Sequence, residues 1–344
     1  MPTFVDLRSD TVTLPTPRMM QAIATAQLGD DVFGEDPTVQ KLQRVVAEKL
    51  GKEDALFVAS GTMGNLVAVL THCGRGHEMI VGDQAHVFVY EAGGSAALGG
   101  VHVRTVPNGK GVPSLEDVEG AIRTPDVHFP RTRLLCLENT HNRCGGVAIT
   151  VQQTEALVDL AHRHGLSVHV DGARLFNAAV ALGVEARDLV AKVDSVNVCL
   201  SKGLSAPVGS VLAGSAEFMA EARRNRKMVG GGMRQAGILA AAGLVAVEEM
   251  VDRLAEDHAN ARLLAEGLAS IDGAEVDLGA VQTNIVVVSI TRPDLTAAEF
   301  ISRMAEMGVK VIGFGGNKVR LVTHYGIERS DAERALEAAR KVLA

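Results

Sequence analysis

Short apolar runs alternate with amphipathic stretches along most of this chain of 344 residues. Seven runs rich in Val, Ile, Leu or Phe have the length of β-strands, and they cover residues 54–60, 78–83, 101–106, 133–139, 166–171, 195–200 and 209–214. Runs with few polar positions are typical of strands buried on both faces. Helical patterns lie between them, at residues 62–73, 114–123 and 152–165. This alternation predicts an α/β fold of three layers, a mostly parallel sheet covered by helices on both faces.

The pattern changes after residue 233. Residues 233–268 read as one long alanine-rich helical stretch, and strand and helix patterns of a different order follow it. This order predicts a smaller C-terminal α+β domain joined through a long connecting helix. We place the boundary near Val247, so that residues 1–247 hold an N-terminal arm and the large domain, and residues 248–344 form the small domain.

The first 37 residues differ from both parts. They are rich in Pro, Asp and Thr and have few regularly spaced apolar positions. We expect an extended arm that becomes ordered by lying on another surface, for which a second subunit is one candidate.

Composition and charge narrow the class of protein. The chain is 47% hydrophobic and has a formal net charge of −7, from 34 basic and 41 acidic residues that are scattered along it. No basic face is offered to nucleic acid or to an anionic membrane, so we expect neither partner. No run reaches the roughly 18 apolar residues of a membrane span, and charges and prolines stand where a signal peptide needs an apolar core. We expect a cytoplasmic protein.

The four cysteines are too few for a disulfide framework in a chain of this length. Cys136 and Cys144 also lack the CxxC spacing of zinc or redox sites. We therefore expect free thiols in a reducing compartment, and no metal site.

Three polar features follow predicted strands. Lys202 comes just after residues 195–200, and a buried lysine favours the neutral amine, a nucleophile toward aldehydes. Asp171 ends residues 166–171, with Arg174 three positions later. The turn SGTMGN, from Ser60 to Asn65, joins a strand to a helix and offers backbone N–H groups to a phosphate.

Each feature also has an ordinary interpretation. Lys202 suits a surface loop, Asp171 and Arg174 suit a helix cap and a solvated helix face, and SGTMGN suits a capped helix start. In an open α/β sheet, however, ligands bind outside the carboxyl ends of the strands, where all three would converge. Pyridoxal 5'-phosphate requires this set: a lysine for a Schiff base, a carboxylate for the pyridine nitrogen, and donors for the phosphate.

Ten blocks of sequence, in order along nearly the whole chain, resemble the low-specificity L-threonine aldolases. The blocks are DLRSDTVTLPT, GDDVFGEDPTVQKLQ, SGTMGNLVAV, EAGG, LENTHN, HVDGARLFNA, CLSKGL, APVGSVL, RKMVGGGMRQAGILAAAG and VRLVTH. The resemblance implies the pyridoxal-phosphate fold type I, of the aspartate aminotransferase-like kind. It also implies a homotetramer, a dimer of dimers with shared active sites.

The resemblance implies how the cofactor is held. The residues implied are Gly61, Thr62, His86, Asp171, Arg174, Lys202 and Arg234. Lys202 would form the Schiff base, Asp171 would pair with the pyridine nitrogen, and Arg174 would contact the O3′ side of the ring. Gly61 and Thr62 would hold the phosphate, and His86 would stack on the ring.

The resemblance also implies how an amino-acid substrate is bound. Ser9 and Arg320 would grip its carboxylate, for which a guanidinium fork is suited. His128 would meet the substrate hydroxyl. Lys227 and Arg234 would reach a neighbouring subunit's active site, and which of the two touches phosphate stays open.

The implied activity is reversible retro-aldol cleavage of L-threonine, L-allo-threonine and related β-hydroxy-α-amino acids to glycine and an aldehyde. Lys202, Asp171, His86 and His128 would be the catalytic residues, with either histidine as the base for the β-hydroxyl. Phe33, where the family usually has tyrosine, and the loop at residues 143–148, with its two glycines, depart from the family pattern.

Two other classes of function are weighed against this one. A β-eliminating lyase, an amino-acid racemase or a transaminase would keep the cofactor and change the bond that breaks. A nucleotide-binding α/β protein is disfavoured, because no glycine-rich fingerprint is followed by an acidic residue about 20 positions on.

Overall fold

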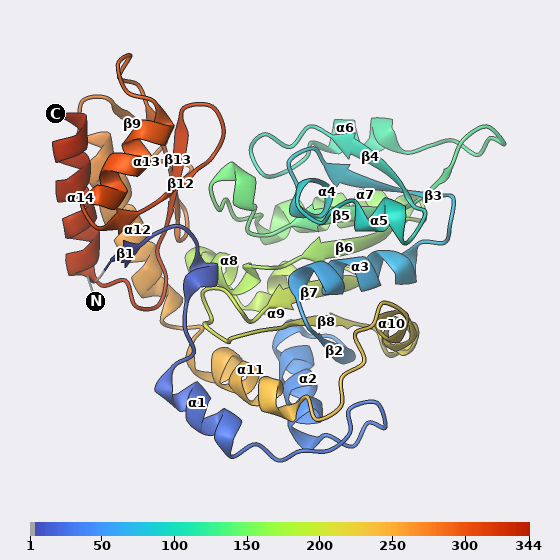
Figure 1. Cartoon of the computed structure of the whole chain (residues 1–344). Coiled ribbons are helices and arrows are strands. Elements are labelled where there is room, and N and C mark those ends of the chain that lie inside the picture. The colour runs from blue at the N-terminus through green and yellow to red at the C-terminus, as the bar shows by residue number, and fades with distance from the viewer. Residues whose placement is uncertain (1–3) are drawn as a thin grey trace.

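The computed structural model describes residues 4–344. The larger part is built on a seven-stranded sheet (Figure 1). Its strands, in spatial order, are β2 (Asp54–Val58), β8 (Ser210–Gly214), β7 (Ser195–Cys199), β6 (Ser167–Asp171), β5 (Arg131–Glu138), β3 (His77–Gly82) and β4 (His102–Val106). Only β8 runs antiparallel to its neighbours, β2 and β7. All seven predicted strands are confirmed, and the carboxyl ends of the parallel ones meet at one edge.

Helices cover both faces of this sheet. On one face lie α2 (Pro37–Leu50), α6 (Leu115–Ala121), α7 (Val151–Arg163), α8 (Leu175–Leu182), α9 (Ala186–Leu189) and α11 (Gly237–Glu249). On the other face lie α3 (Gly61–His72) and α10 (Ala216–Met228), with the short α4 (His86–Val89) and α5 (Gly94–Ala97) beside them. Alternate strand residues pack into each layer: Phe57 faces the first set of helices, and Leu56 and Val58 face the second. The predicted three-layer α/β architecture is confirmed.

The smaller part has its own sheet and core. Its antiparallel sheet has the order β12 (Ile312–Gly313), β13 (Lys318–Val322), β10 (Ile285–Ile290) and β9 (Ala274–Val276). The helices α12 (Leu254–Ala269), α13 (Ala297–Glu306) and α14 (Arg329–Leu343) pack against it. The predicted smaller α+β unit is therefore present. Leu254 still packs in the large core and Ala261 in the small one, and the boundary near Val247 stays a prediction.

The single connecting helix predicted for residues 233–268 is wrong. The structure has two helices, α11 and α12, separated by a turn at Met250–Arg253. No Gly or Pro lies in that turn, so the sequence gives no local signal for it. Met250 and Leu254 are both buried in the large core, and the chain turns there to carry α12 into the small one.

The N-terminal segment is held by its own chain. Val5–Asp6 form β1, which pairs with β11 (Val309–Lys310) of the small part. Farther on, the 3-10 helix η1 (Asp10–Val12) precedes α1 (Pro17–Ala24), which the extended-arm prediction missed. Thr16 caps α1 and Pro17 occupies its first turn, a local signal for a helix start.

Within residues 4–344, no helix combines the length and the apolar character needed to cross a membrane.

Candidate active site

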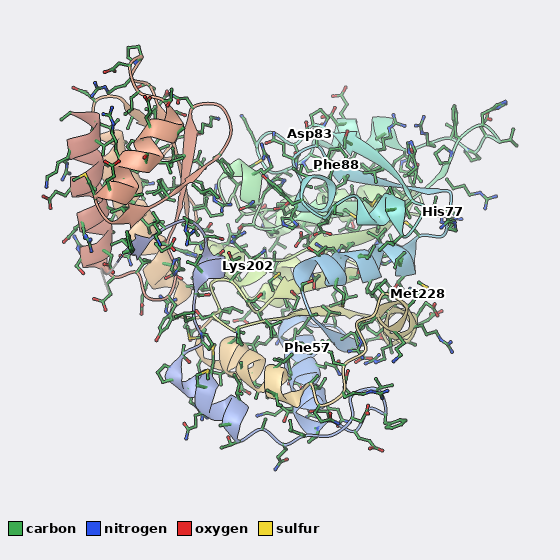
Figure 2. The ribbon with its side chains drawn as sticks, in the orientation of Figure 1. Phe57, His77, Asp83, Phe88, Lys202 and Met228 are labelled. Carbon is green, nitrogen blue, oxygen red and sulfur yellow. The ribbon has the colours of Figure 1, made fainter. Side chains whose placement is uncertain are left out.

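A cavity of about 310 Å³ lies at the carboxyl edge of the large sheet, bordered also by the small part and the N-terminal segment. Five of the predicted site residues line it: Ser9, His86, Arg174, Lys202 and Arg320. Figure 2 shows Lys202 close to η1, between the large sheet and the small part. Segments that are far apart in the sequence thus bring these side chains together.

The turn that carries Lys202 is held by several hydrogen bonds. After β7 the chain folds back, and the N–H of Leu200 donates to Gly209 O over 3.0 Å. The Lys202 carbonyl accepts from the N–H of Ser205 (2.8 Å) and from the Thr13 hydroxyl (3.1 Å). These contacts fix the backbone of Lys202 and leave its half-buried side chain facing the cavity.

Arg174 is fixed by a residue that the sequence analysis did not single out. Its Nε and Nη2 donate to the two carboxylate oxygens of Asp10, over 2.6 and 2.7 Å, and both residues are buried. Burial alone would raise the pKa of Asp10, but Arg174 and Lys202 outweigh it and hold this pKa well below its usual value. Asp10 therefore stays ionised beside the two cations.

Asp171 lies beneath the cavity in a hydrogen-bonded setting. Its Oδ1 accepts from the N–H of Ala173 (3.1 Å) and its Oδ2 from the side chain of Asn65 (3.0 Å). The same amide group of Asn65 also donates to Glu91 (2.8 Å). Glu91 in turn contacts Nδ1 of His86 at 2.9 Å, so one connected set links the carboxylate to the imidazole.

This set changes the proton affinities of its members. Burial lowers the pKa of His86, but the hydrogen bond to Glu91 and the charge of Asp171 outweigh it, and the net change is upward. Burial and then Asp171 raise the pKa of Glu91, against the hydrogen bonds from His86 and Asn65. Because Nδ1 of His86 is engaged with Glu91, Nε2 is the ring nitrogen left for a substrate.

The start of α3 forms a cradle for an anion. Ser60 caps the helix, its Oγ accepting from the N–H of Met63 over 3.2 Å. The N–H groups of the first turn have no partner within a helix, and they attract anions. A Cβ at Gly61 would lie 2.8 Å from Cys199 Sγ, so glycine allows this turn to approach β7 closely. Gly61 and Thr62 stand at the same sheet edge as Asp171 and the turn of Lys202.

Arg320, on β13, offers a donor to the cavity. Its Nη1 donates to Asn142 (2.8 Å) and its Nη2 to the carbonyl of Arg8 (3.0 Å). Its Nε is buried and has no hydrogen-bond partner within residues 4–344. Burial, and then the charge of Arg174, lower the pKa of Arg320. An anionic group in the cavity would accept a hydrogen bond from this Nε and would balance the positive charges of Arg320 and Arg174. Ser9 lines the same cavity.

His128 is not brought to the cavity of its own chain. It lies in the loop before β5, at the opposite edge of the sheet, with its side chain 82% exposed and 2.7 Å from Asp126. β5 is eight residues long, which at ~3.3 Å per residue separates the two edges by roughly 25 Å. Contact of His128 with a substrate in its own chain's cavity is therefore ruled out by this placement.

Lys227 and Arg234 also lie outside the cavity. Both are exposed, and Arg234 forms an ion pair with Asp30 at 3.0 Å. The three-glycine segment between them passes the start of α3, since a Cβ at Gly231 would lie 2.6 Å from Met63 Sδ. Their side chains are thus on the surface of the chain.

Pyridoxal phosphate fits the donors that converge here. Lys202 follows β7, Asp171 ends β6 and the first turn of α3 follows β2, and these strands lie within four neighbouring strands of one sheet. His86 and Lys202 line the same cavity. The buried Nε of Arg320 suits the carboxylate of an amino acid. The sequence analysis missed three residues that support this set: Asp10, Asn65 and Glu91. Each lies within a block quoted above, but only the fold shows what it contacts.

Comparison with known proteins adds to this geometry. The family model described as beta-eliminating lyase matches residues 6–291. A probable low-specificity L-threonine aldolase 2 of Arabidopsis thaliana is 50% identical over 343 residues, covering 98% of this chain and 97% of that protein. The low specificity L-threonine aldolase of Escherichia coli (strain K12) is 44% identical over 326 residues, covering 94% and 95%. The solved threonine aldolase of Leishmania major superposes with a TM-score of 0.85 at 22% identity, covering 99% of this chain and 100% of that one.

Proposed function

The chain belongs to the beta-eliminating lyase family and, within it, to the threonine aldolases, and from that membership we propose that it cleaves L-threonine and L-allo-threonine to glycine and acetaldehyde with pyridoxal phosphate. The observation that carries the proposal is the convergence of Lys202, Asp171 and the start of α3 at one sheet edge, where the cofactor's three requirements are met together. Two relatives that are 50% and 44% identical over nearly their full length are named probable low-specificity L-threonine aldolase 2 and low specificity L-threonine aldolase.

We propose that each side chain has a separate task. The start of α3, with Gly61 and Thr62, binds the phosphate, and Lys202 binds the aldehyde carbon. Asp171 keeps the ring nitrogen protonated. When bound, pyridoxal phosphate withdraws electrons from the α-carbon of the amino acid, which allows the Cα–Cβ bond to break. Arg174, held in place by Asp10, would bind the ring's oxygen substituent.

Orientation of the substrate selects the bond that breaks. We propose that Arg320 and Ser9 hold the substrate carboxylate, with the unpartnered Nε of Arg320 as one donor. Gripping the carboxylate fixes the rotation about the bond between nitrogen and the α-carbon. The β-carbon substituent would then face His86, which lines the same cavity as Ser9 and Arg320.

We propose His86 as the base for the β-hydroxyl. Its Nδ1 is held by Glu91, so Nε2 can accept the hydroxyl proton as the Cα–Cβ bond breaks. Glu91 and Asp171 stabilise the imidazolium that results, consistent with the upward direction of the pKa of His86. The hydroxyl proton moves to the imidazole only as the Cα–Cβ bond breaks, and the neutral form of His86 is the one that can accept it.

We also propose that the protein is a homotetramer and that it is located in the cytoplasm. What supports the assembly is the position of His128, Lys227 and Arg234, which are exposed and away from the cavity of their own chain. If these residues act on a substrate or a cofactor, they do so at another subunit's site. What supports the compartment is that Cys73, Cys136, Cys144 and Cys199 are all free thiols.

Product analysis tests the function. Purified protein with added pyridoxal phosphate is incubated with L-threonine and L-allo-threonine side by side, and glycine and acetaldehyde are measured. We expect the two products in equal amounts from each substrate. Formation of 2-oxobutyrate and ammonia without glycine would overturn the proposal in favour of β-elimination, the reaction that the matched family is named after.

A further inference from the structure

A stripe of polar side chains lies between α3 and the strands β6 and β7, and most of its members are buried. Asn65 and His72, two turns apart, share one face of α3. The facing positions of β6 and β7 alternate along their strands and so point to the same side of the sheet. The buried members are Asn65, His169, Asp171, Ser195 and Asn197, none more than 2% exposed.

Such a stripe is costly in a protein core. Burying a polar group costs free energy unless it is hydrogen-bonded, and apolar side chains of similar size would pack here without that cost. The next residues of α3, Val67, Ala68 and Val69, do pack in the ordinary way. The stripe therefore needs a reason other than stability, and its hydrogen bonds supply one.

The hydrogen bonds form an unbroken chain to the site. His72 Nε2 lies 2.8 Å from Ser195 Oγ, which lies 2.8 Å from His169 Nδ1. His169 Nε2 lies 3.1 Å from Asn65 Oδ1. The amide nitrogen of Asn65 then reaches Asp171 at 3.0 Å, and Glu91 at 2.8 Å.

The donor and the acceptor of each hydrogen bond in this chain can be assigned by starting at Asp171. The amide nitrogen of Asn65 donates to Asp171 and to Glu91, so its amide oxygen faces His169. His169 must then carry its proton on Nε2, and its bare Nδ1 accepts from the Ser195 hydroxyl. The Ser195 oxygen in turn accepts from Nε2–H of His72. Burial lowers the pKa of His169 to about 3 and that of His72 to about 4, so both rings are neutral with one proton each.

We propose that Asn65 is a positioning residue, whose amide is oriented by His169, Ser195 and His72 and holds the Asp171 carboxylate in the orientation that faces the cofactor's ring nitrogen. The inference rests on the proposed function, since Asp171 needs a fixed orientation only if it serves a ring. Asn65 also keeps Asp171 and Glu91 apart by donating one hydrogen to each.

A second amide connects Asn65 to the anion cradle. Asn197 donates to Asn65 Oδ1 over 3.2 Å and to the carbonyl of Gly61 over 3.1 Å. The ring end and the phosphate end of the cofactor site are therefore joined through two buried amides. Displacing Asn65 disturbs both ends.

Two substitutions at Asn65 test the proposal against a matched control. Asn65→Leu removes the donor at similar volume, and Asn65→Asp keeps the shape but adds a third carboxylate. Asn225→Leu is the control, because Asn225 is also a buried asparagine that contacts α3, through Thr71 at 3.0 Å, and it touches no site residue.

Losing a hydrogen bond to a buried charge corresponds to about a 10- to 100-fold effect. We expect Asn65→Leu to lower kcat with L-threonine by about that factor while KM changes less than about threefold. Equilibrium dialysis should show that the apoenzyme binds pyridoxal phosphate about 10-fold more weakly. Asn65→Asp should lose more of both kcat and cofactor affinity, whereas Asn225→Leu should keep both at the wild-type level. An Asn65→Leu protein with wild-type kcat and cofactor affinity would overturn the proposal.

Nitrogen NMR of the apoenzyme with isotope-labelled histidines tests the proposal without an activity assay. Near neutral pH, His169 should show a protonated Nε2 and a bare Nδ1. A proton on Nδ1 instead would reverse the chain, turn the oxygen of Asn65 toward the carboxylates and refute the proposal. If the wild-type protein failed to cleave threonine, the proposed function would fall while this tautomer result would stand, so the two failures are distinguishable.

Discussion

Three charged side chains set the electrostatics next to the cavity. Asp10 pairs with Arg174 through two short hydrogen bonds, and Lys202 is close enough to lower the pKa of the same carboxyl. Asp10 and Arg174 are buried, so neither charge is screened by water to the degree of a surface pair. The pair therefore both fixes the guanidinium and limits the excess of positive charge beside the amine.

Replacing Asp10 by asparagine tests this pair. Asp10→Asn leaves the Arg174 guanidinium buried opposite a neutral amide, and breaking a buried pair in this way costs about 3–5 kcal/mol. The midpoint of urea unfolding of the apoenzyme should fall accordingly. Asp159→Asn is the control, because Asp159 forms an exposed ion pair with Lys192 at 3.1 Å, and such changes stay within about 0.5 kcal/mol.

The same pair has a defined pH dependence. The pKa of Asp10 is lowered on folding, so its stabilisation is fully present above the unfolded value of about 3.9 and is lost as the pH falls toward the folded value. Wild-type protein should lose stability below about pH 4 more steeply than Asp10→Asn. Equal urea midpoints of the two proteins at neutral pH would contradict this account.

At the scale of elements, α3 combines several tasks. Its first turn forms the anion cradle, Asn65 in its second turn contacts Asp171, and His72 at its end closes the hydrogen-bond chain. These tasks require α3 to lie very close to β7. Gly61 and Gly64 permit the approach, since a Cβ at Gly64 would lie 2.2 Å from Asn197 Oδ1.

Alanine at position 64 tests the close approach. Alanine favours a helix over glycine by about 1 kcal/mol, yet the added methyl group must displace Asn197, and overpacking costs about 1–3 kcal/mol. We expect Gly64→Ala to lower the Tm of the apoenzyme. Gly120→Ala in α6 is the matched control, because open space surrounds the Cβ position there and only the gain in helix propensity remains. A raised Tm in both variants would show that α3 does not need the contact.

Elements also show what the sequence could predict. Most strands of the large sheet were found because strands buried on both faces are continuous apolar runs. The turn between α11 and α12 was missed, since it contains no residue that ends a helix and depends on which core each side chain enters. α1 was missed although Thr16 and Pro17 mark its start, because its eight residues are too short for a helical period to be recognised.

At the scale of the whole molecule, three histidines with lowered pKa values contribute to the response to acid. Burial lowers the pKa of His72 and of His258 to about 4, and that of His169 to about 3. The unfolded chain binds these protons below about pH 6.5, whereas the folded protein does not until it is more acidic. Stability is therefore fully present above about pH 6.5 and is lost as the pH falls toward the folded values.

At pH 5 each of these rings should reduce the free energy of unfolding by about 2 kcal/mol relative to pH 7.5. Thermal unfolding of the apoenzyme at the two pH values measures the effect. His258→Asn, outside the site, should reduce the difference in Tm, and His128→Asn should not, because His128 is 82% exposed. The same difference in all three proteins would contradict the role of burial.

The site residues that follow the ends of strands could be predicted from the sequence. Lys202, Asp171 and the SGTMGN turn each follow an apolar run, so the sheet edge brings them together without knowledge of side-chain contacts. The partners of these residues were not predictable: Asp10 and Arg174 are 164 positions apart, and Asn65 and Asp171 are 106 apart. Only the packed fold pairs them. His128 marks a further limit, because a role for it requires a second subunit.

Reduction with borohydride tests the central claim most directly. The protein with bound pyridoxal phosphate is reduced and digested, and the peptides are analysed by mass spectrometry. We predict a pyridoxyl group on Lys202, absent from Lys202→Ala, while Lys227 and the other lysines stay unmodified. A protein that carries no pyridoxyl group after reduction, or carries it on a different lysine, would contradict the account.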